Sequence, residues 1–255
     1  MDLFDLTGRV ALVTGGGRGL GKGMALALAH AGAHVAVTSR TRDQLEETLA
    51  ELRAAGGTDE HLALPCDVTD LRALEMAMAE VDRHYGGLDV LLNAAGIQVR
   101  KPALEVTPAD FDLVAAVNLL SAYFAAVYAA RIMRERGRGG KIIHVASLGT
   151  SIGLRGASIY TTTKSGIAGM VRTTALEWAP LGIQVNAIGP GYYRTDLTEV
   201  LFQDPERYAW LMSRIPLGRT GVPEDLAGAT IYLASKASDY VTGQIVNVDG
   251  GWLAG

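Results

Sequence analysis

Short, continuously apolar runs alternate along this chain with longer stretches in which apolar residues recur at helical spacing. The runs at residues 10–13, 35–37 and 90–92 contain no polar residue, and the stretches at 20–31 and 45–55 have helical periodicity. Strands that are apolar at every position are typical of parallel sheets, because helices cover both faces of such sheets. Right-handed crossovers place those helices on both sides. The pattern predicts the α/β class, with a doubly wound parallel sheet of about seven strands.

The expected elements follow one another without a linker or a low-complexity segment. Strands are expected at 10–13, 35–37, 62–64, 90–92, 141–145, 184–188 and 245–248, and helices at 20–31, 45–55, 71–85, 113–130, 159–178, 197–214 and after 223–225. We therefore expect residues 1–255 to form one domain, with a helical excursion at 192–220 that contacts substrate. Ligands of such sheets bind at the carboxyl ends of strands, where the strand order reverses. The chemistry is expected just after each strand.

Composition excludes several classes of function. The net charge is -4, the pI is about 5.7 and no basic stripe is present, so we expect no nucleic-acid partner. Cys66 is the single cysteine and cannot form an intramolecular disulfide, and the first residues lack the features of a signal peptide. These features predict a cytoplasmic protein. Its five histidines have no ligand spacing, so no metal site is expected.

Residues 113–130 carry no charge, which reaches the lower length limit for a membrane span. Asn118, Ser121 and Tyr123 interrupt the stretch, however, and a helix that is apolar all round also fits burial in a large protein or at a subunit interface. We therefore expect no membrane contact. Together with the helix after Tyr160, this apolar surface predicts a homotetramer.

A glycine-rich turn follows the first expected strand and opens the first helix. Such a turn presents backbone N–H groups and the positive end of the helix dipole to a pyrophosphate. The strict G-x-G-x-x-G spacing is absent, and a plain tight turn is the alternative interpretation. The candidate cofactor residues here are Gly15, Arg18, Gly19, Leu20 and Gly21.

Ser39 and Arg40 stand at the end of the second strand, where an NAD-binding protein would have a carboxylate for the ribose 2′-hydroxyl. Arg40, together with Arg18 on the glycine turn, can instead bind a 2′-phosphate with a planar guanidinium fork. Either arginine alone would be ordinary solvated surface, but the two together predict NADP(H) as the cofactor.

Short polar and small residues follow the next two strands. Asp67 and Val68 can meet an adenine edge, although Asp67 can equally cap the helix after it. The small residues at 93–96 permit close contact with a cofactor, although Asn93 can also be a turn residue. The candidate residues of this second segment are Asn93, Ala94, Ala95 and Gly96.

Ser147 ends the fifth strand, and Tyr160 and Lys164 follow on the next helix. Residues four apart share one helical face, so the phenol and the ammonium can occupy one pocket. A nearby cation lowers the pKa of tyrosine and makes it a general acid/base, while Ser147 can hydrogen-bond the reacting oxygen. A tyrosine and a lysine at this spacing are also common as a surface pair. Their position behind a serine-ended strand favours the catalytic interpretation.

In chain order, these motifs resemble those of the short-chain dehydrogenase/reductase family, and the resemblance covers essentially the whole chain. It implies a Rossmann-type fold and an NADP-dependent oxidoreductase acting on CH–OH groups. The motifs that carry it are 14–21, Asp67, Asn93–Gly96 (with Ala94 in place of the more usual asparagine), Asn118, Ser147, Tyr160, Lys164, Pro190, Gly191 and Thr195. The resemblance implies that Tyr160 is the acid/base and that Ser147 orients the carbonyl. It also implies that Lys164 binds the nicotinamide ribose and lowers the pKa of Tyr160.

The resemblance assigns two further regions. Asn118 would hold a water in a proton relay, although on the residue pattern alone it is a core amide. The segment with Pro190, Gly191, Tyr193 and Thr195 resembles the loop that contacts the nicotinamide carboxamide.

Residues 96–100 and 238–254 are similar to the sugar-acid branch of the family, the gluconate 5-dehydrogenase and 2-deoxy-gluconate dehydrogenase types. Arg100 and Tyr192 are the candidate substrate residues beside Ser147 and Tyr160, and Arg100 would clamp a sugar-acid carboxylate. A solvated loop arginine is the alternative, and Arg155 is a rival cation. Alternative functions are reduction of 3-oxoacyl groups on an acyl carrier protein, reduction of neutral ketones, or a non-catalytic NADP-binding sensor.

Overall fold

The computed structural model describes residues 2–55, 58, 60–195 and 204–255. The strands are β1 (Val10–Thr14), β2 (His34–Ser39), β3 (Leu62–Pro65), β4 (Val90–Asn93), β5 (Gly140–Val145), β6 (Ile183–Pro190) and β7 (Ile245–Val248). The helices are α1 (Gly19–His30), α2 (Arg42–Ala54), α3 (Leu71–Tyr85), α4 (Pro108–Ala115), α5 (Ser121–Arg136), α6 (Ser158–Trp178), α8 (Pro205–Arg214) and α9 (Ala227–Ala234). All seven expected strands are confirmed.

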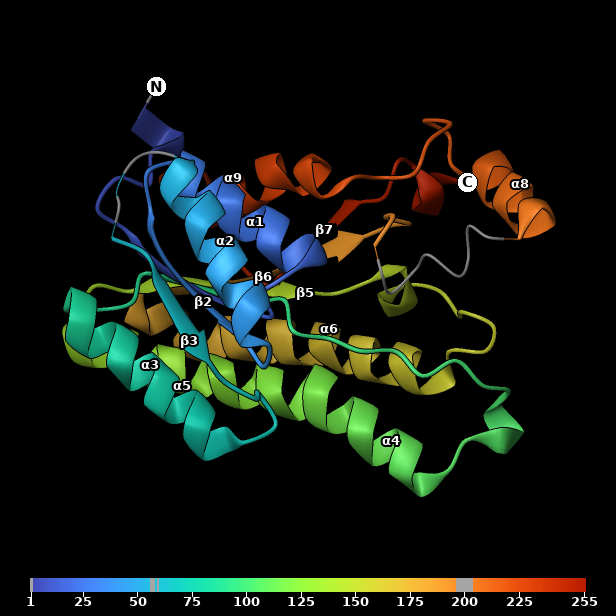
Figure 1. The fold of residues 1–255 in the computed structure, drawn as a ribbon, viewed down its shortest axis with the longest axis horizontal. Helices are drawn as coiled ribbons and strands as arrows, with labels where there is room; N and C mark the ends of the chain where they lie inside the picture. Colours follow the sequence, from blue (N-terminus) through green and yellow to red (C-terminus); the bar gives the residue numbers. More distant parts are fainter. Residues whose placement is uncertain (1, 56–57, 59, 196–203) are drawn as a thin grey trace.

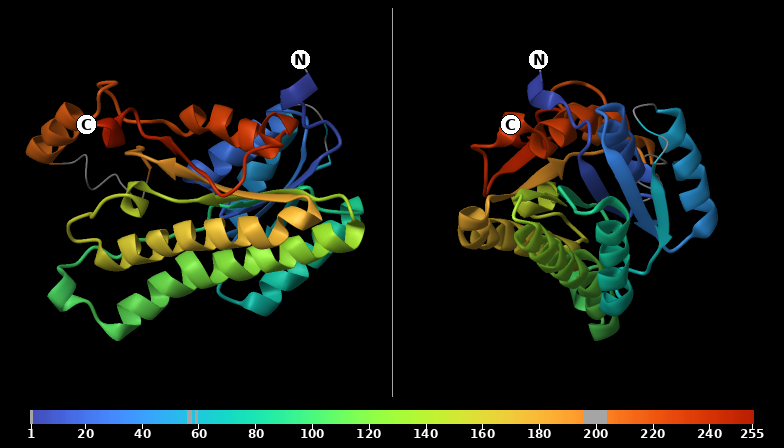
Figure 2. Two further views of the ribbon diagram at one scale, coloured as in Figure 1. Left: turned by 180° about the vertical axis from the view of Figure 1, so that it is seen from behind. Right: turned by 90° about the vertical axis from the view of Figure 1, so that its left-hand side faces the viewer.

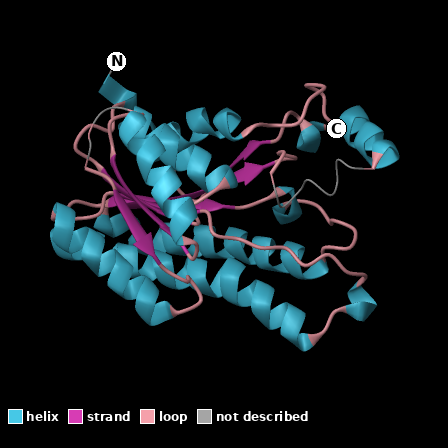
Figure 3. Cartoon of the chain, viewed as in Figure 1, coloured by secondary structure: helices cyan, strands magenta, loops and turns pink. Residues whose placement is uncertain are grey.

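The strands form one parallel sheet in the order β3-β2-β1-β4-β5-β6-β7. Helices α1, α2 and α9 cover one face and α3, α4, α5 and α6 the other (Figures 1 and 3). The doubly wound α/β fold predicted from the apolar pattern is therefore confirmed. The strand order reverses between β1 and β4, where Thr14 pairs with Asn93. Both strands end at the same edge of the sheet, which opens a crevice for a ligand.

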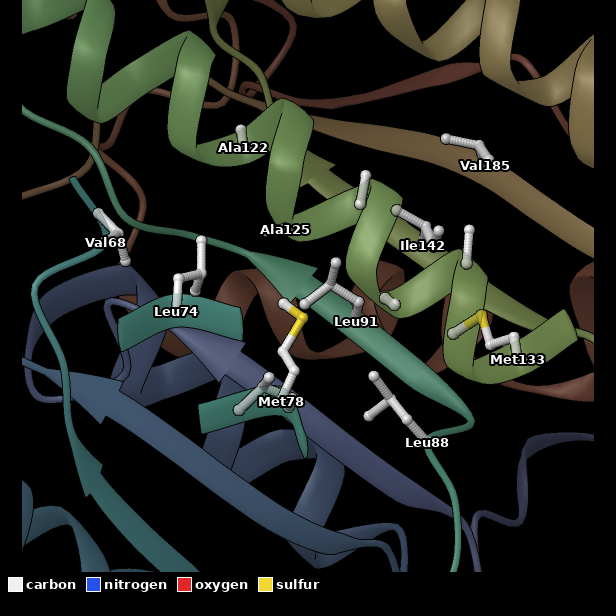
Figure 4. Close-up of a cluster of buried hydrophobic side chains, with 14 of the residues drawn as sticks. Val68, Leu74, Met78, Leu88, Leu91, Ala122, Ala125, Met133, Ile142 and Val185 are labelled. Atoms are coloured by element: carbon white, nitrogen blue, oxygen red, sulfur yellow. The ribbon is translucent and has the colours of Figure 1, made fainter. Parts of the chain in front are cut away.

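Two apolar cores lie on the two faces of the sheet. The first joins α3, α5 and α6 to the strands, and Figure 4 shows Met78 of α3 near Leu91 of β4, with Met133 of α5 in the same cluster. The second joins α1, α2 and α9 to the other face through residues such as Leu28 and Leu233. Burial of both faces explains why the runs at residues 10–13, 35–37 and 90–92 are apolar at every position.

Local signals fix the ends of the helices. The Asp70 carboxylate caps α3 by accepting the N–H groups of Arg72 and Ala73, and Gly86 ends this helix with φ 74°. Asp67 is therefore not the cap that the sequence allowed; it accepts hydrogen bonds from Thr69 instead. Side-chain caps of this kind supply partners for amide groups that the first helical turn leaves unpaired.

The expected single helix at 113–130 consists of three parts. Helix α4 ends at Ala115, a π-helical turn spans Ala116–Leu120, and α5 continues from Ser121. The stretch Pro108–Arg136 is long and apolar enough to cross a membrane, but half of its most apolar window is buried inside the protein. That burial agrees with the expected core helix.

Of the helix expected at 197–214, the structure describes only the part from residue 204 onward. Helix α8 begins at Pro205 behind the cap Asp204, and residues 196–203 lie outside the described residues. Helix α8 lies apart from the two helical layers, beside the chain terminus and the carboxyl ends of β6 and β7 (Figures 1 and 2). The Leu211 side chain of this helix is buried against Leu148 and Trp252, so α8 is anchored next to Ser147.

Candidate functional site

A cavity of about 480 Å³ opens along the carboxyl ends of the strands. Most residues predicted to bind a cofactor line it, namely Gly15, Arg18, Gly19, Leu20, Gly21, Ser39, Arg40, Asp67, Val68, Ala94, Ala95, Gly96, Tyr160, Lys164 and Thr195. The lining also includes Gly17 of the glycine-rich motif, which was not among the predicted cofactor residues, and residues outside the motifs, namely Gln44, Cys66, Ile97, Val117 and Val145. The cavity thus runs from the end of β2 to the helix that carries Tyr160.

The glycine turn lies directly against the loop after β4. Gly15 has φ 68°, and a Cβ atom at this position would lie 2.7 Å from Cα of Ala95. A Cβ atom on Gly21 would meet the carbonyl oxygen of Gly15, so the first turn of α1 packs closely against the glycine turn. Side chains are excluded from the floor of the cavity, which leaves room for a phosphate to contact backbone N–H groups.

The far end of the cavity is polar and carries two exposed arginines, Arg18 and Arg40. The Arg40 guanidinium lies 3.9 Å from the carboxylate of Asp67. Asp67 is the one acidic residue among the described residues that line the cavity, and it is engaged with Thr69 and Arg40. Hydrogen bonds from Thr69 and the Arg40 charge hold the pKa of Asp67 below its usual value. The residues present therefore fit a 2′-phosphate better than a free 2′-hydroxyl.

Asn93 is buried at the end of β4, where it bonds to neighbouring protein groups and does not line the cavity. Its amide donates to the carbonyl of Ala122 at 3.2 Å, and its Nδ2 lies 3.3 Å from Nδ1 of His144. The hydroxyl of Thr14 donates to its Oδ1 at 3.4 Å. In this structure Asn93 thus acts on the cavity through the position of the β4 loop, not by lining it.

Ser147, Tyr160 and Lys164 converge at the near end of the cavity. Ser147 lies just beyond β5, while Tyr160 and Lys164 lie in the first two turns of α6. The hydroxyls of Ser147 and Tyr160 share a hydrogen bond, and Nζ of Lys164 lies 5.7 Å from the centre of the Tyr160 ring. Lys164 is buried and donates to the carbonyl of Val145 at 2.6 Å. The structure brings together the three side chains that the sequence grouped.

The electrostatics differ from the expectation that Lys164 lowers the pKa of Tyr160. Burial raises the pKa of Tyr160, and the groups that oppose this rise are the hydroxyl of Ser147 and the charge of Arg100. Burial also lowers the pKa of Lys164 to about 8. The phenol is therefore protonated at neutral pH, and a protonated phenol held by Ser147 is suited to donate a proton to a carbonyl oxygen.

Asn118 lies in the π-helical turn and holds the loop after β4. Its Oδ1 accepts the N–H of Ile97 at 2.8 Å, and its Nδ2 donates to the carbonyl of Ile97 at 2.9 Å. The same Nδ2 donates to Thr163 at 3.3 Å, which links the loop to α6. The side chain was predicted to take part in a water relay, and its observed contacts are with protein groups that border the catalytic helix.

The segment after β6 is only partly directed at the cavity. Thr195 lines it, but the amide of Gly191 donates to the carbonyl of Val248. The buried Tyr193 hydroxyl also donates to Val248, at 2.9 Å. A Cβ atom on Gly191 would lie 2.6 Å from Cα of Asp249, so this glycine serves close packing against the end of β7. Pro190, Gly191 and Tyr193, predicted as cofactor residues, are thus placed as supports for the loop.

Arg100 and Tyr192 lie at the mouth of the site. Arg100 is exposed to solvent, but the protein partly covers its side chain. This partial burial lowers the pKa of Arg100, and the charge of Arg207 lowers it further. The Tyr192 ring packs 4.7 Å from that of Trp252. Among the described residues, the Arg100 side chain has no hydrogen-bond or ion-pair partner. The rival Arg155 is exposed and is not among the groups that shift the pKa of Tyr160.

Cys66 and the possible metal ligands complete the set of reactive side chains. Burial raises the pKa of Cys66 to about 11, which makes this thiol a poor nucleophile. Across the part of the chain that the structure describes, no group of three His, Cys, Asp or Glu side chains is arranged to hold a metal ion.

Comparison with known proteins identifies the family of the chain. The sequence matches the family described as Enoyl-(Acyl carrier protein) reductase over residues 15–253. It is 41% identical over 254 residues to 2-dehydro-3-deoxy-D-gluconate 5-dehydrogenase of Escherichia coli (strain K12), covering 100% of this chain and 99% of that protein. It is 40% identical over 256 residues to L-2,3-butanediol dehydrogenase of Corynebacterium glutamicum, covering 96% of this chain and 98% of that protein.

Solved structures give the same result. The gluconate 5-dehydrogenase from Burkholderia cenocepacia J2315, in complex with NADP and tartrate, has a TM-score of 0.94 and 36% identity, covering 100% of this chain and 98% of that chain. With this similarity in sequence and fold, the chain belongs to the short-chain dehydrogenase/reductase family and is an oxidoreductase. The family and the enzyme class predicted from the motifs are confirmed.

We expect Tyr160→Phe to lower kcat by about a hundredfold or more, because only the transferable proton is lost and the ring remains. The dissociation constant of NADPH should stay nearly unchanged, whereas Lys164→Ala should impair both turnover and cofactor binding. Tyr128→Phe, on α5 away from Ser147, is the matched control. Retention of more than a tenth of wild-type kcat by Tyr160→Phe, measured by NADPH oxidation, would contradict this role.

Proposed function

We propose that the protein is a cytoplasmic NADP(H)-dependent dehydrogenase/reductase that interconverts a ketone and a secondary alcohol on a sugar acid, with 5-keto-D-gluconate as the first substrate to test. The observation that carries the substrate class is Arg100. Its guanidinium has no ionic partner among the described residues, and its charge acts on the pKa of Tyr160. A substrate that reacts at Tyr160 can therefore place a carboxylate at Arg100.

Different residues along the cavity bind different parts of the cofactor. The N–H groups of the Gly15–Gly21 turn and the start of α1 hold the pyrophosphate, and Arg18 and Arg40 hold the 2′-phosphate. Ala95, Gly96 and Thr195 border the nicotinamide end, and Lys164 holds its ribose. The close contact of Gly15 with Ala95 and the arginine-rich far end of the cavity support this arrangement.

The bound nicotinamide supplies or accepts the hydride, and the protein moves the proton. In reduction, the Ser147 hydroxyl hydrogen-bonds the substrate carbonyl oxygen, and Tyr160 donates its phenolic proton to that oxygen as charge develops. Burial keeps Tyr160 protonated before the transfer, and the charge of Arg100 stabilises the phenolate that the transfer leaves. Asn118 keeps the loop after β4 in place beside the reacting groups.

Two names among the similar proteins support the substrate class. Tartrate, which the similar gluconate 5-dehydrogenase holds, is a hydroxy acid with carboxylates. A sugar acid is also the substrate in the name of the 41% identical dehydrogenase. The similarity to L-2,3-butanediol dehydrogenase favours a second candidate, reduction of small neutral ketones or diketones, which would leave the catalytic assignment intact.

We also propose a homotetramer. The outer surface of α4, α5 and α6 exposes large apolar side chains, including Leu113 (52% exposed), Tyr123 (45%) and Leu176 (80%). A cavity of about 820 Å³ lies between these helices. Apolar surface of this extent on one face is typical of subunit contacts in symmetric assemblies.

The cofactor proposal predicts that kcat/KM is higher with NADPH than with NADH. Ser39→Asp combined with Arg40→Leu should reverse the preference, because a carboxylate accepts the 2′-hydroxyl but repels a 2′-phosphate. Arg42→Leu, which removes the same charge from the first turn of α2, should leave the preference unchanged. Equal efficiencies with both cofactors in the wild type, at matched ionic strength, would refute the claim.

The substrate proposal predicts that Arg100→Ala raises KM for 5-keto-D-gluconate. The rise should correspond to a loss of about 1.5 to 3 kcal/mol of binding free energy, the range for a hydrogen bond to a charged group. The KM of uncharged ketones should not change. Lys101→Ala is the matched control, because the Lys101 ammonium binds Asp110 at 2.6 Å instead of facing the mouth. A wild-type enzyme that reduces neutral ketoses or diketones well but ignores 5-keto-D-gluconate would remove the sugar-acid assignment.

The tetramer should be visible by light scattering as a mass four times the 26.9 kDa of one chain. Tyr123→Glu should lower that mass, because it places a charge in the apolar contact. Met76→Glu changes an exposed apolar residue of α3, outside this face, and should not alter the assembly. A wild-type mass of one chain at micromolar concentration would show that the apolar face is not a subunit contact.

A further inference from the structure

Helix α8 carries a second cation to the mouth of the site. Leu211 of this helix is buried in one cluster with Leu148, the residue after Ser147, and with Trp252. The Trp210 ring lies 5.6 Å from that of Trp252, which in turn contacts Tyr192. The face of α8 with residues 210 and 211 is therefore the face that packs beside the site.

Arg207 lies on that face. It precedes Leu211 by four residues and Trp210 by three, the spacings at which side chains of a helix stack on one another. Burial lowers the pKa of Arg100 and raises that of Tyr192, and the charge of Arg207 acts on both groups, so its guanidinium lies near both side chains at the mouth. Two elements far apart in sequence, the loop after β4 and α8, thus direct arginines at the same opening.

Neither arginine is neutralised by the part of the protein that the structure describes. No side-chain hydrogen bond or ion pair joins Arg100 or Arg207 to any described residue, whereas Lys101 binds Asp110 and Arg219 binds Asp225 close by in the chain. Two like charges kept together without an anion repel each other, and this repulsion adds to burial in lowering the pKa of Arg100. An anionic group placed between them removes the repulsion and adds charge-assisted hydrogen bonds.

We propose that Arg207 is a second substrate-binding residue, which holds the carboxylate of the sugar acid together with Arg100. The proposal rests on the proposed function, since it concerns the same substrate. With one guanidinium on each side, both carboxylate oxygens are bound, and the ketone at the other end of the substrate reaches Ser147 and Tyr160. A neutral ketone gains nothing from the second arginine, so Arg207 selects for an acid.

The test compares two substrates that differ only at the carboxylate. L-sorbose has the same open-chain skeleton as 5-keto-D-gluconate, with a CH₂OH group in place of the acid. Arg207→Gln should raise KM for 5-keto-D-gluconate about 5- to 20-fold, the scale of a partly exposed charged hydrogen bond, with kcat within about threefold. Its kcat/KM for L-sorbose and its dissociation constant for NADPH should stay at the wild-type values.

Two further variants serve as controls. Arg207→Lys keeps the charge and should recover most of the lost affinity for the acid. Arg134→Gln removes the same charge from the exposed last turn of α5 and should change neither substrate's kinetics. An Arg207→Gln enzyme that loses kcat/KM equally for both substrates would show a purely structural role and overturn the proposal.

The outcomes separate this proposal from the proposed function. If Arg100→Gln raises KM for the acid and Arg207→Gln behaves like Arg134→Gln, Arg207 is not a substrate residue, although the sugar-acid function stands. If the wild type prefers L-sorbose to 5-keto-D-gluconate, the proposed function itself fails. A higher kcat/KM for fructose 6-phosphate than for the keto acid would show that the arginine pair holds a phosphate and would overturn the carboxylate assignment.

Discussion

The parallel pairing of β1 with β4 is the constraint on which the site depends. Thr14 lies opposite Asn93 in that register, so the two strands end together, and the turn at Gly15 contacts the loop at Ala95. The same register continues through β5, which brings the carbonyl of Val145 to this edge, where it accepts the ammonium of Lys164. A slip of one residue between β1 and β4 would separate the phosphate turn from the catalytic helix and destroy the cavity.

Helix-to-loop contacts then convert a strand edge into a chemical site. The carboxamide of Asn118 holds Ile97 through two backbone hydrogen bonds and reaches α6 through Thr163. Its place in a π-helical turn fits this role, because such turns displace a side chain from the regular helical pattern and occur often at functional sites. The two cations of the site also have different partners. The ammonium of Lys164 donates to a backbone carbonyl, whereas the charge that acts on the pKa of the Tyr160 phenol is that of Arg100 at the mouth of the site.

The sequence was sufficient for the fold because apolar periodicity reports burial directly, and central strands such as β1 and β4 are buried at every position. It was sufficient for Ser147, Tyr160 and Lys164 because a strand end and one helical face define their positions. It could not reveal the π-helical turn, since the same apolar run fits a regular helix equally well. The burial of Tyr193 was also hidden, because its partner Val248 is 55 residues away in the chain. The nearness of Arg207 to Arg100 likewise depends on how α8 docks, which no local pattern specifies.

The buried ammonium of Lys164 has a consequence for the stability of the protein. Its pKa falls from 10.5 to about 8 on folding, so at neutral pH it is charged in both the folded and unfolded states and disfavours folding by about 3 kcal/mol. That cost would disappear only as the pH rose from 8 towards 10.5 and the unfolded chain also lost the proton. A dinucleotide that binds only the folded chain offsets the cost by mass action. Bound cofactor therefore stabilises the folded enzyme against unfolding, as well as taking part in its reaction.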